Sequence, residues 1–191
     1  MEDTMLQFPL ALIDTEYTAD ESSRKTNWRN QHKEIIQIGI VAIGRDLSIL
    51  ESARMYVRPK LNPVLSDYIK TLTGIKQSDV NGAPHLADAW KRVRAYCANR
   101  TLYVFGGDAA VIADNFMLNR EEVPPEIARM HDVRSFIRAR CVVAGIKDAH
   151  EYTSGTLCQA FGIKGDRPHD ALNDMKNLRL VLLELRKRGL L

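Results

Sequence analysis

The sequence predicts an α/β protein with a mixed five-stranded sheet flanked by helices. Three apolar runs that favour strands follow one another in the first third of the chain. Beyond them, short strand-like runs alternate with segments whose apolar residues have helical spacing. Consecutive strands pair antiparallel, whereas strands separated by helices pair parallel, so we expect both kinds of pairing in one sheet.

The length and composition are typical of a globular domain. The chain has 191 residues, of which 45% are apolar and 27% are charged. A single core can grow to roughly 200–250 residues before a chain divides into domains. We therefore predict one domain over residues 1–191, with its core over residues 8–190. The formal charge of +3 neither indicates nor excludes a nucleic-acid partner, so the placement of the charges matters more.

The sequence has no feature of a membrane or exported protein. No apolar run reaches the roughly 18–20 residues that span a bilayer. The N-terminal residues are acidic and lack the basic region of a signal peptide. Cys97, Cys141 and Cys158 are widely spaced in apolar or helical surroundings, which favours buried thiols in a reducing compartment. We expect a cytoplasmic protein with no membrane partner.

The first three strands are expected to form an antiparallel meander. Their runs are rich in Val, Ile and Leu, as strands are, and they lie at residues 6–13, 34–44 and 47–59. Gly44-Arg45-Asp46 suits a hairpin turn between the second and third strands. Pro59 ends the third strand, because proline has no N–H to donate to a neighbouring strand.

A long polar segment, residues 19–33, is inserted between the first two strands. It carries five basic residues, which are Arg24, Lys25, Arg29, His32 and Lys33. Two interpretations stay open. The segment is a solvated loop, or it is a basic flap near a functional site, because it begins just after Glu16 and long ordered loops often have a function.

The rest of the chain is expected to alternate between helices and two short strands. The short strands lie at residues 101–105 and 128–133. Gly106-Gly107 stops the first of them, and Gly145 closes the helix that follows the second. The predicted helices have apolar residues on one face and lie at residues 63–75, 83–100, 108–120, 134–146, 153–163 and 169–189.

A pair of acids, Asp14 and Glu16, follows the apolar run of the first strand. Residues i and i+2 of a strand point to the same face, so both carboxylates project together while Thr15 points away. Held side by side, the two carboxylates repel each other. Either they are two exposed charges at a strand end, or they are ligands of a hard cation such as Mg²⁺ or Mn²⁺.

Two further acids are expected at the same edge of the sheet. Asp108 follows the strand at residues 101–105, and Asp174 lies at the start of the closing helix. Strand ends and the helix starts that follow them gather at one edge, and a pair of divalent ions would remove the repulsion among four carboxylates. Asp114 is the competitor of Asp108. We prefer Asp108, because it adjoins the strand end and Asp114 is rotated by about 120° from it around the helix.

His169 stands five residues before Asp174. On one continuous helix this offset is about 140°, so the two side chains would not share a face. Pro168 suits a helix entry, so His169 is expected in the loop or first turn before the helix, where it can converge with Asp174. A single histidine is usually structural or exposed. Beside two metal ions, however, a neutral imidazole can take the proton from an attacking water.

Three segments together resemble the exonuclease motifs of the DEDDh 3′-to-5′ exonucleases, which have an RNase H-like fold. They are IDTEYT (13–18), FGGD (105–108) and HDALND (169–174). TLTGIKQSDV (71–80), GTLCQAFGI (155–163) and HDALNDMKNL (169–178) most resemble the Eri-type exoribonuclease and KapD-like branch. The resemblance runs from about Leu10 to Leu185. The second motif departs from the family pattern, because it lacks the usual His-Asn or Trp-Gly-Asn before its Asp.

The resemblance implies a two-metal hydrolase that releases nucleoside 5′-monophosphates from 3′ ends. It implies that two Mg²⁺ or Mn²⁺ ions are bound by Asp14, Glu16, Asp108 and Asp174, with His169 as the general base. It places the terminal nucleotide near four residues, which are Thr15, Tyr17, Leu72 and Thr73. Leu72 is equally explained by core packing. Tyr17 points away from the acids only if the strand stays regular. Arg167 and the basic loop are candidates for phosphate contacts, or are solvated charges.

RNA is the expected substrate, as a single strand or a short overhang, because the resemblance is to exoribonucleases. The alternative is a DNA-directed 3′-to-5′ exonuclease of the repair or proofreading type. A third hypothesis is a non-catalytic module that binds nucleic acid or protein, and the complete set of acids with His169 argues against it. Many relatives dimerise, so a homodimer stays open, although the sequence identifies no interface.

Overall fold

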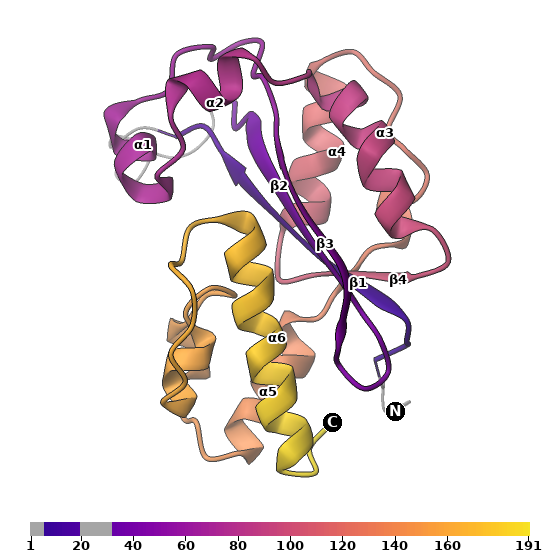
Figure 1. Ribbon diagram of the computed structural model, residues 1–191, viewed down its shortest axis with the longest axis vertical. Helices are drawn as coiled ribbons and strands as arrows, with labels where there is room; N and C mark the ends of the chain where they lie inside the picture. Colours follow the sequence, from indigo (N-terminus) through magenta and orange to yellow (C-terminus); the bar gives the residue numbers. More distant parts are fainter. Residues whose placement is uncertain (1–5, 20–31) are drawn as a thin grey trace.

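A five-stranded mixed sheet forms the centre of the computed structural model, which describes residues 6–19 and 32–191 (Figure 1). The strand order is β3-β2-β1-β4-β5. β2 pairs antiparallel with both β1 and β3. β4 pairs parallel with β1, and β5 pairs parallel with β4. This confirms the predicted mixed sheet and its initial meander. The strands are β1 (Leu10–Tyr17), β2 (Ile35–Ile43), β3 (Ile49–Tyr56), β4 (Thr101–Val104) and β5 (His131–Asp132).

The central strand β1 runs four residues beyond the apolar run that predicted it. It begins at Leu10, after Pro9, and it continues through Asp14 and Glu16 to Tyr17. The expected strand at residues 6–13 was therefore placed too early. The paired residues of β2 supply hydrogen-bonding partners as far as Tyr17, so the two acids lie within the strand rather than after it.

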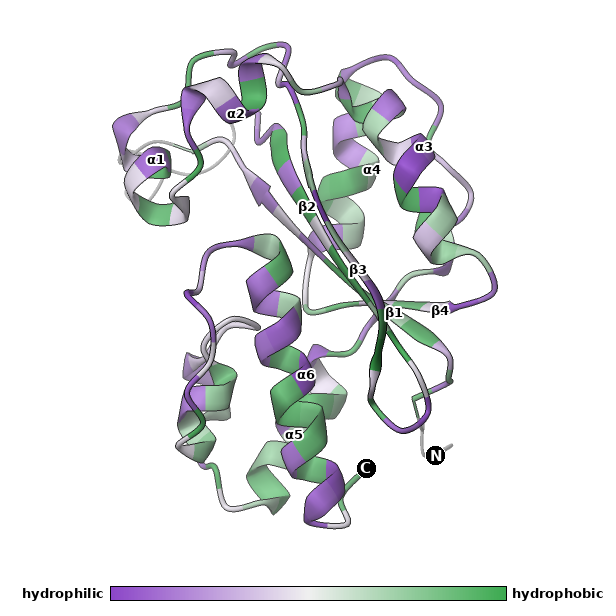
Figure 2. Ribbon diagram, in the orientation of Figure 1, coloured by the Kyte–Doolittle hydropathy of each residue, from purple (hydrophilic) through white to green (hydrophobic). Residues whose placement is uncertain are grey.

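Helices cover both faces of the sheet (Figure 1). One core lies between β1, β2 and the helices α5 (Arg134–Val143) and α6 (Ala171–Lys187). The other core lies between the opposite face of these strands and the helices α3 (Leu86–Cys97) and α4 (Asp108–Leu118). In Figure 2 these helices carry both hydrophobic and hydrophilic residues, as amphipathic helices packed on a sheet do.

The predicted helix at residues 63–75 was wrong at its start. The helix α1 spans Asp67–Thr73, because the Ser66 hydroxyl accepts a hydrogen bond from the Ile69 N–H at 3.1 Å and caps it. Val64, expected on the buried face, is 78% exposed. A short helix that was not predicted, α2 (Gln77–Asn81), follows. Both helices pack on a third, smaller core around Ile36.

Two other elements are smaller than expected. The strand predicted at residues 128–133 is reduced to the two residues of β5, because a 3-10 helix, η3 (Ile127–Arg129), precedes it and α5 begins at Arg134. The short helix predicted at residues 153–163 is also a 3-10 helix, η5 (Leu157–Phe161). One more 3-10 helix, η4 (Ala149–Glu151), lies between α5 and η5.

The polar segment at residues 19–33 lies outside the described residues except at its two ends, and Arg24, Lys25 and Arg29 lie outside them as well. Within the described ranges, no helix has both the length and the apolar character that crossing a bilayer requires. Cys141 and Cys158 are buried free thiols, and Cys97 is half-buried.

Candidate active site

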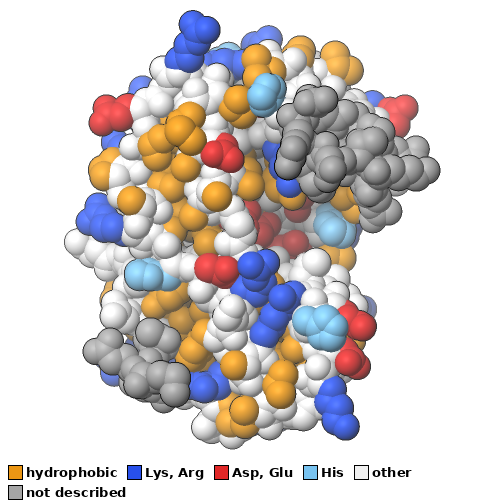
Figure 3. Space-filling model, turned by 180° about the vertical axis from the view of Figure 1, so that it is seen from behind, with side chains coloured by type: hydrophobic (Ala, Val, Ile, Leu, Met, Phe, Trp, Pro, Cys, Tyr) orange, Lys and Arg blue, Asp and Glu red, His pale blue; other side chains and the backbone are white. Residues whose placement is uncertain are grey.

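Three carboxylates meet where β1 faces the start of α6. One oxygen each from Asp14, Glu16 and Asp174 lie within 4.8 Å of one another. Asp14 and Asp174 are buried, with 7% and 5% of their surfaces exposed, and Glu16 is half-buried. In Figure 3 acidic side chains are visible inside a hollow near the middle of the molecule. The structure thus brings together residues that are up to 160 positions apart in the sequence.

The strand β2 determines where α6 begins, and therefore where Asp174 lies. Gly39, the β2 partner of Asp14, has no side chain, and the backbone of Ala171 occupies the space that a Cβ would take. The neighbouring Gln37 is fully buried. Its Oε1 accepts a hydrogen bond from the Ala171 N–H at 2.7 Å, and its Nε2 donates to Asp170, the N-cap of α6, at 3.3 Å.

Asp108 is the first residue of α4 and lies on the other side of β1 from Asp174. Its Oδ1 accepts two hydrogen bonds from Thr15, one from the backbone N–H at 3.1 Å and one from the hydroxyl at 2.6 Å. Asp108 is not part of the group of three close carboxylates, but its charge raises the pKa of both Asp14 and Glu16. The Thr15 hydroxyl thus turns to Asp108, away from the other two acids.

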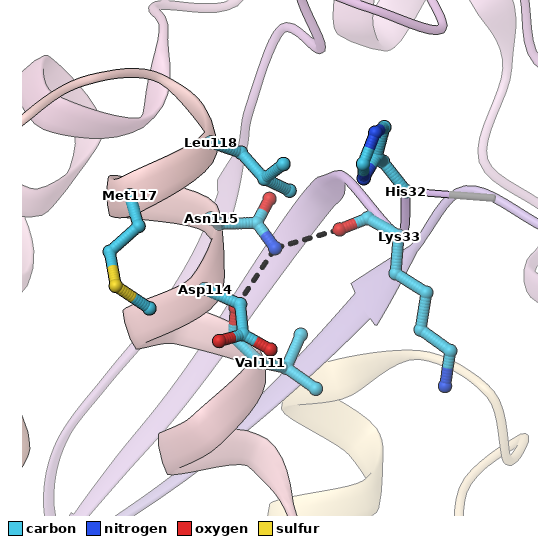
Figure 4. A pocket seen from close by; sticks show the side chains of 7 residues that line it. All are labelled: His32, Lys33, Val111, Asp114, Asn115, Met117 and Leu118. Carbon is cyan, nitrogen blue, oxygen red and sulfur yellow. Dashed lines mark hydrogen bonds between the residues drawn. The ribbon is translucent and has the colours of Figure 1, made fainter. Parts of the chain in front are cut away.

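The competitor, Asp114, lies elsewhere. It is exposed on α4, almost two turns beyond Asp108, and it lines a separate pocket with Val111 and Leu118 (Figure 4). It does not contribute to the raised pKa of Asp14 or Glu16. Of the two candidates in the second motif, the structure places Asp108 beside β1.

Burial and mutual repulsion make the acids difficult to ionise together. Burial, followed by the charges of neighbouring acids, raises the pKa of Glu16 to about 8. Burial likewise raises the pKa of Asp174 to about 7, with Asp170 and Asp108 adding to the shift. The pKa of Asp14 lies well above its usual value for the same reasons. A close set of buried oxygen donors with this repulsion fits a divalent hard cation, which would relieve it.

His169 lies between Pro168 and the α6 cap, so it precedes the helix, as expected from the sequence. Its backbone has a φ of 61°, a left-handed value that residues other than glycine rarely adopt. The His169 N–H donates to Asp174 Oδ1 at 3.1 Å. The backbone of His169 and the carboxylate of Asp174 are therefore held together in one turn of the chain.

The hydroxyls proposed for substrate contact are already engaged within the protein. Thr73 is buried, and its Oγ1 donates to the Ile69 carbonyl at 2.8 Å and accepts from the Ile75 N–H at 3.1 Å. The Thr15 hydroxyl donates to Asp108. Through these hydrogen bonds, Thr15 positions the Asp108 carboxylate and Thr73 positions the end of α1.

Tyr17 ends β1, Leu72 lies in α1, and Arg167 lies in the loop before α6. The pairing of β1 with β2 shifts between Glu16 and Tyr17, so the strand is not regular there. Lys33 Nζ lies 4.4 Å from the centre of the Tyr17 ring. Leu72 is half-buried against the third core. The exposed Arg167 donates from Nη2 to the carbonyls of Thr71 and Leu72 at 3.1 and 3.3 Å, which joins the loop before α6 to the end of α1.

The residues that hold Asp174 and the start of α6 in place were not predicted from the sequence. Gln37 is the one polar residue in the otherwise apolar β2, and this could have indicated a buried polar contact. Gly155 leaves room for Asp174, because a Cβ there would collide with its carboxylate. Asn177, also buried, donates to the carbonyls of Gly155 and Asp166, both at 2.9 Å. These two residues carry no pattern that marks them in advance.

Comparison with curated proteins finds exonucleases. The chain is 30% identical over 180 residues to the probable 3′-5′ exonuclease KapD of Bacillus subtilis, covering 90% of this chain and 83% of that protein. It is 25% identical over 214 residues to ERI1 exoribonuclease 3 of Bos taurus, covering 97% of this chain and 57% of that protein. A shorter match, 39% over 80 residues, is to the 3′-5′ exonuclease eri1 of Schizosaccharomyces pombe, covering 41% of this chain and 26% of that protein. The chain thus spans only part of the eukaryotic relatives.

Solved structures share the architecture. The nuclease domain of 3′hExo, a DEDDh family member, bound to rAMP, has a TM-score of 0.75 and 25% identity, covering 94% of this chain and 92% of that domain. A 3′-exonuclease that recognises the histone mRNA stem-loop has a TM-score of 0.79 and 23% identity, covering 94% of this chain and 64% of that one. These likenesses confirm the predicted RNase H-like fold.

The sequence model of the RNase_T exonuclease family matches residues 11–182, from β1 into α6. The match includes all three segments in which Asp14, Asp108 and Asp174 lie. The chain therefore belongs to the RNase_T family of exonucleases, and within it to the DEDDh 3′-to-5′ exonucleases.

Proposed function

We propose that this protein hydrolyses nucleic acid from the 3′ end and releases nucleoside 5′-monophosphates, with single-stranded RNA or a short RNA overhang as the preferred substrate. The observation that carries the proposal is the group of Asp14, Glu16 and Asp174 beside Asp108, with the backbone of His169 held against Asp174. The preference for RNA is supported by the relatives named as exoribonucleases and by the likeness to a nuclease domain bound to rAMP.

The four carboxylates would hold two divalent ions, Mg²⁺ or Mn²⁺. Such ions would supply the acidification of the attacking water and the stabilisation of the charge on the leaving 3′ oxygen. His169 would accept the proton from that water, and the hydrogen bond from its backbone N–H to Asp174 holds the main chain that carries the imidazole against this carboxylate. Thr15 acts through Asp108, because its two hydrogen bonds orient that carboxylate.

The terminal nucleotide would lie between β1 and α1. Tyr17 and Leu72 are half-buried and offer apolar surface for it. Thr73 contributes by fixing the end of α1. Arg167 is exposed and joined to the same end of α1, so its remaining N–H groups can reach a phosphate of the substrate.

The test is nucleotide release from a 3′-labelled RNA in the presence of Mn²⁺. Asp14→Asn is expected to abolish the release of nucleoside 5′-monophosphates, because it removes one charge from the centre of the carboxylate group. Asp88→Asn, a matched change at an exposed position of α3, should leave the rate unchanged. Full activity of Asp14→Asn, or activity that persists in EDTA, would contradict the mechanism.

The choice of polymer is tested separately. RNA and DNA oligonucleotides of the same sequence, each 3′-labelled and each offered single- and double-stranded, are compared by kcat/KM. We expect the single-stranded RNA to be the best substrate, because a contact to the 2′-hydroxyl distinguishes the two polymers. Equal values for RNA and DNA would contradict the preference, and a higher value for DNA would favour a DNA-directed exonuclease.

A further inference from the structure

The pocket lined by Asp114 lies between α4 and the residues that precede β2 (Figure 4). Its volume is about 540 Å³, within the roughly 300–1,000 Å³ of sites that hold small ligands. Apolar side chains from α4 and an exposed histidine, His32, form much of its wall. The lining residues are His32, Lys33, Val111, Asp114, Asn115, Met117 and Leu118.

The pocket and the candidate metal site both involve α4. This helix begins at Asp108. Among the pocket's α4 residues, Val111, Asn115 and Leu118 lie within about 80° of Asp108 around the helix axis, whereas Asp114 and Met117 lie about 120° and 180° from it. Val111 is three residues beyond Asp108, about 4.5 Å along the helix axis, so a polymer whose 3′ end is at the carboxylates would reach this edge of the pocket.

Lys33 connects the pocket with the carboxylates. Lys33 is one of the lining residues, and Figure 4 shows its side chain extending away from α4. Nζ lies 3.4 Å from the hydroxyl of Tyr17, the residue after Glu16, and 4.4 Å from the centre of its ring. Burial lowers the pKa of Lys33, and the negative charge of Asp108 opposes that shift, so the ammonium group is within electrostatic reach of Asp108.

The main chain around Lys33 is firmly held. Asn115 is buried, with 2% of its surface exposed, and its Nδ2 donates to the Lys33 carbonyl at 2.7 Å. Its Oδ1 accepts from the Ile35 N–H at 2.9 Å, so one amide binds the chain on both sides of Glu34. The Glu34 carboxylate accepts hydrogen bonds from the backbone N–H groups of the loop at residues 60–62. Because this backbone is already held, less main-chain entropy is lost when Lys33 binds an anion.

We propose that Lys33 binds a phosphate of the substrate strand, on the nucleotide that supplies the leaving 3′ oxygen, and that the pocket receives the base of this nucleotide. The inference rests on the proposed exonuclease function. A phosphodiester complements the ammonium group of Lys33. The apolar wall and the imidazole of His32 suit the face of a base, and the negative Asp114 favours a base over a phosphate inside the pocket.

The variant Lys33→Met keeps the apolar stem and removes the charge. For single-stranded RNA we expect KM to rise by about tenfold, as the loss of one hydrogen bond to a charged group implies, with kcat little changed. The dependence of log(kcat/KM) on log[salt] should become shallower by about 0.7. Lys91→Met, which removes the same charge from the exposed surface of α3, should have neither effect.

A small substrate separates binding from structural damage. The p-nitrophenyl ester of a nucleoside 5′-monophosphate has no nucleotide on the leaving side, so Lys33→Met should hydrolyse it as the wild type does. An equal loss of activity on the ester and on RNA would show that Lys33 is only structural, and would overturn the proposal.

An RNA that lacks the base next to the 3′-terminal nucleotide tests the pocket itself, without altering the protein. The wild type should show a several-fold higher KM for it than for intact RNA, since stacking of one base contributes about 1–3 kcal/mol. Equal KM values would overturn the assignment of the pocket.

Binding measured without turnover distinguishes this inference from the proposed function. Fluorescence anisotropy of labelled RNA in EDTA should show weaker binding by Lys33→Met than by Lys91→Met. If the wild type releases no nucleotides but this difference remains, the proposed function fails and the Lys33 contact stands. Equal affinities of the two variants would overturn the Lys33 contact.

Discussion

At the scale of single residues, the site depends on hydrogen bonds that backbone N–H groups and one hydroxyl donate to carboxylates. The Thr15 N–H and hydroxyl hold Asp108, and the His169 N–H holds Asp174. His169 reaches this position only with a left-handed φ of 61°, a conformation that costs about 1–3 kcal/mol for a residue with a side chain. The surrounding contacts, including the hydrogen bond from the His169 N–H to Asp174, must offset that cost.

His169→Asn separates the imidazole from the turn that carries it. Asparagine adopts left-handed backbone angles more readily than most residues, so the N–H donated to Asp174 should be kept. We expect kcat on RNA to fall by about 10²- to 10⁴-fold, the usual contribution of a general base, with KM and RNA affinity nearly unchanged. Steady-state kinetics and anisotropy measure the two quantities. An unchanged kcat would exclude His169 as the base.

At the scale of secondary-structure elements, the contact between β2 and the start of α6 assembles the site. Gln37 and Gly39 are successive residues on one face of β2. Gly39 lets the helix approach, and Gln37 binds its first N–H and its cap. Arg54 of β3 also pairs with the cap residue Asp170, at 2.7 Å. His169 and Asp174 are thereby placed opposite Asp14 by strands that contribute none of the proposed metal ligands.

Gln37→Leu should weaken both the fold and catalysis. The substitution leaves the buried Ala171 N–H without its acceptor, which costs about 1–3 kcal/mol of unfolding free energy. Loss of support behind a ligand typically reduces activity by about 10- to 100-fold. Gln77→Leu also removes several hydrogen bonds, but from α2, so it should lower stability without the loss of kcat. Urea unfolding and kcat are compared for both variants. Equal effects on kcat would contradict a positioning role for Gln37.

At the scale of the whole molecule, folding brings acidic side chains together at one end of β1. The sheet brings acids from β1, α4 and α6 to the edge beyond the end of β4, where β1 continues without that neighbour. The folded chain therefore holds some of these acids protonated at a pH where they would ionise in the unfolded chain. This couples stability to pH and to divalent ions.

In EDTA, the free energy of unfolding is expected to fall as the pH rises from about 5 to about 8. Folding raises the pKa of Glu16 from 4.5 to about 8 and that of Asp174 from 3.8 to about 7. Over this window the folded state binds more protons than the unfolded state, so raising the pH favours unfolding. Mg²⁺ or Mn²⁺ should raise the melting temperature most at the alkaline end, because the ions bind the ionised folded form.

Thermal unfolding followed by circular dichroism at several pH values, with EDTA and with Mn²⁺, measures this dependence. Glu16→Gln is the informative variant, since it removes one titrating group and should flatten the curve in EDTA. A melting temperature that rises with pH in EDTA would contradict the raised pKa values of the folded protein.

Much of the fold and of the candidate site follows from the sequence by itself. The Asp-x-Glu spacing puts two carboxylates on one face of a strand, and the alternation of apolar runs predicts the mixed sheet. Pro168 predicts that His169 precedes its helix. These inferences succeed because they depend on local periodicity and on the fixed backbone geometry of a few neighbouring residues.

The tertiary structure alone decided how distant groups pair. The chain before α1 is not helical near Pro63, where the Gln77 side chain accepts a hydrogen bond from the Leu65 N–H, 12 residues away, and donates to the Pro63 carbonyl. Gln37 binds Ala171 from 134 residues away, and Asn115 holds Lys33 from 82 residues away. No local pattern encodes such pairs, since they arise only when the two faces of the sheet are covered and buried polar groups must find partners.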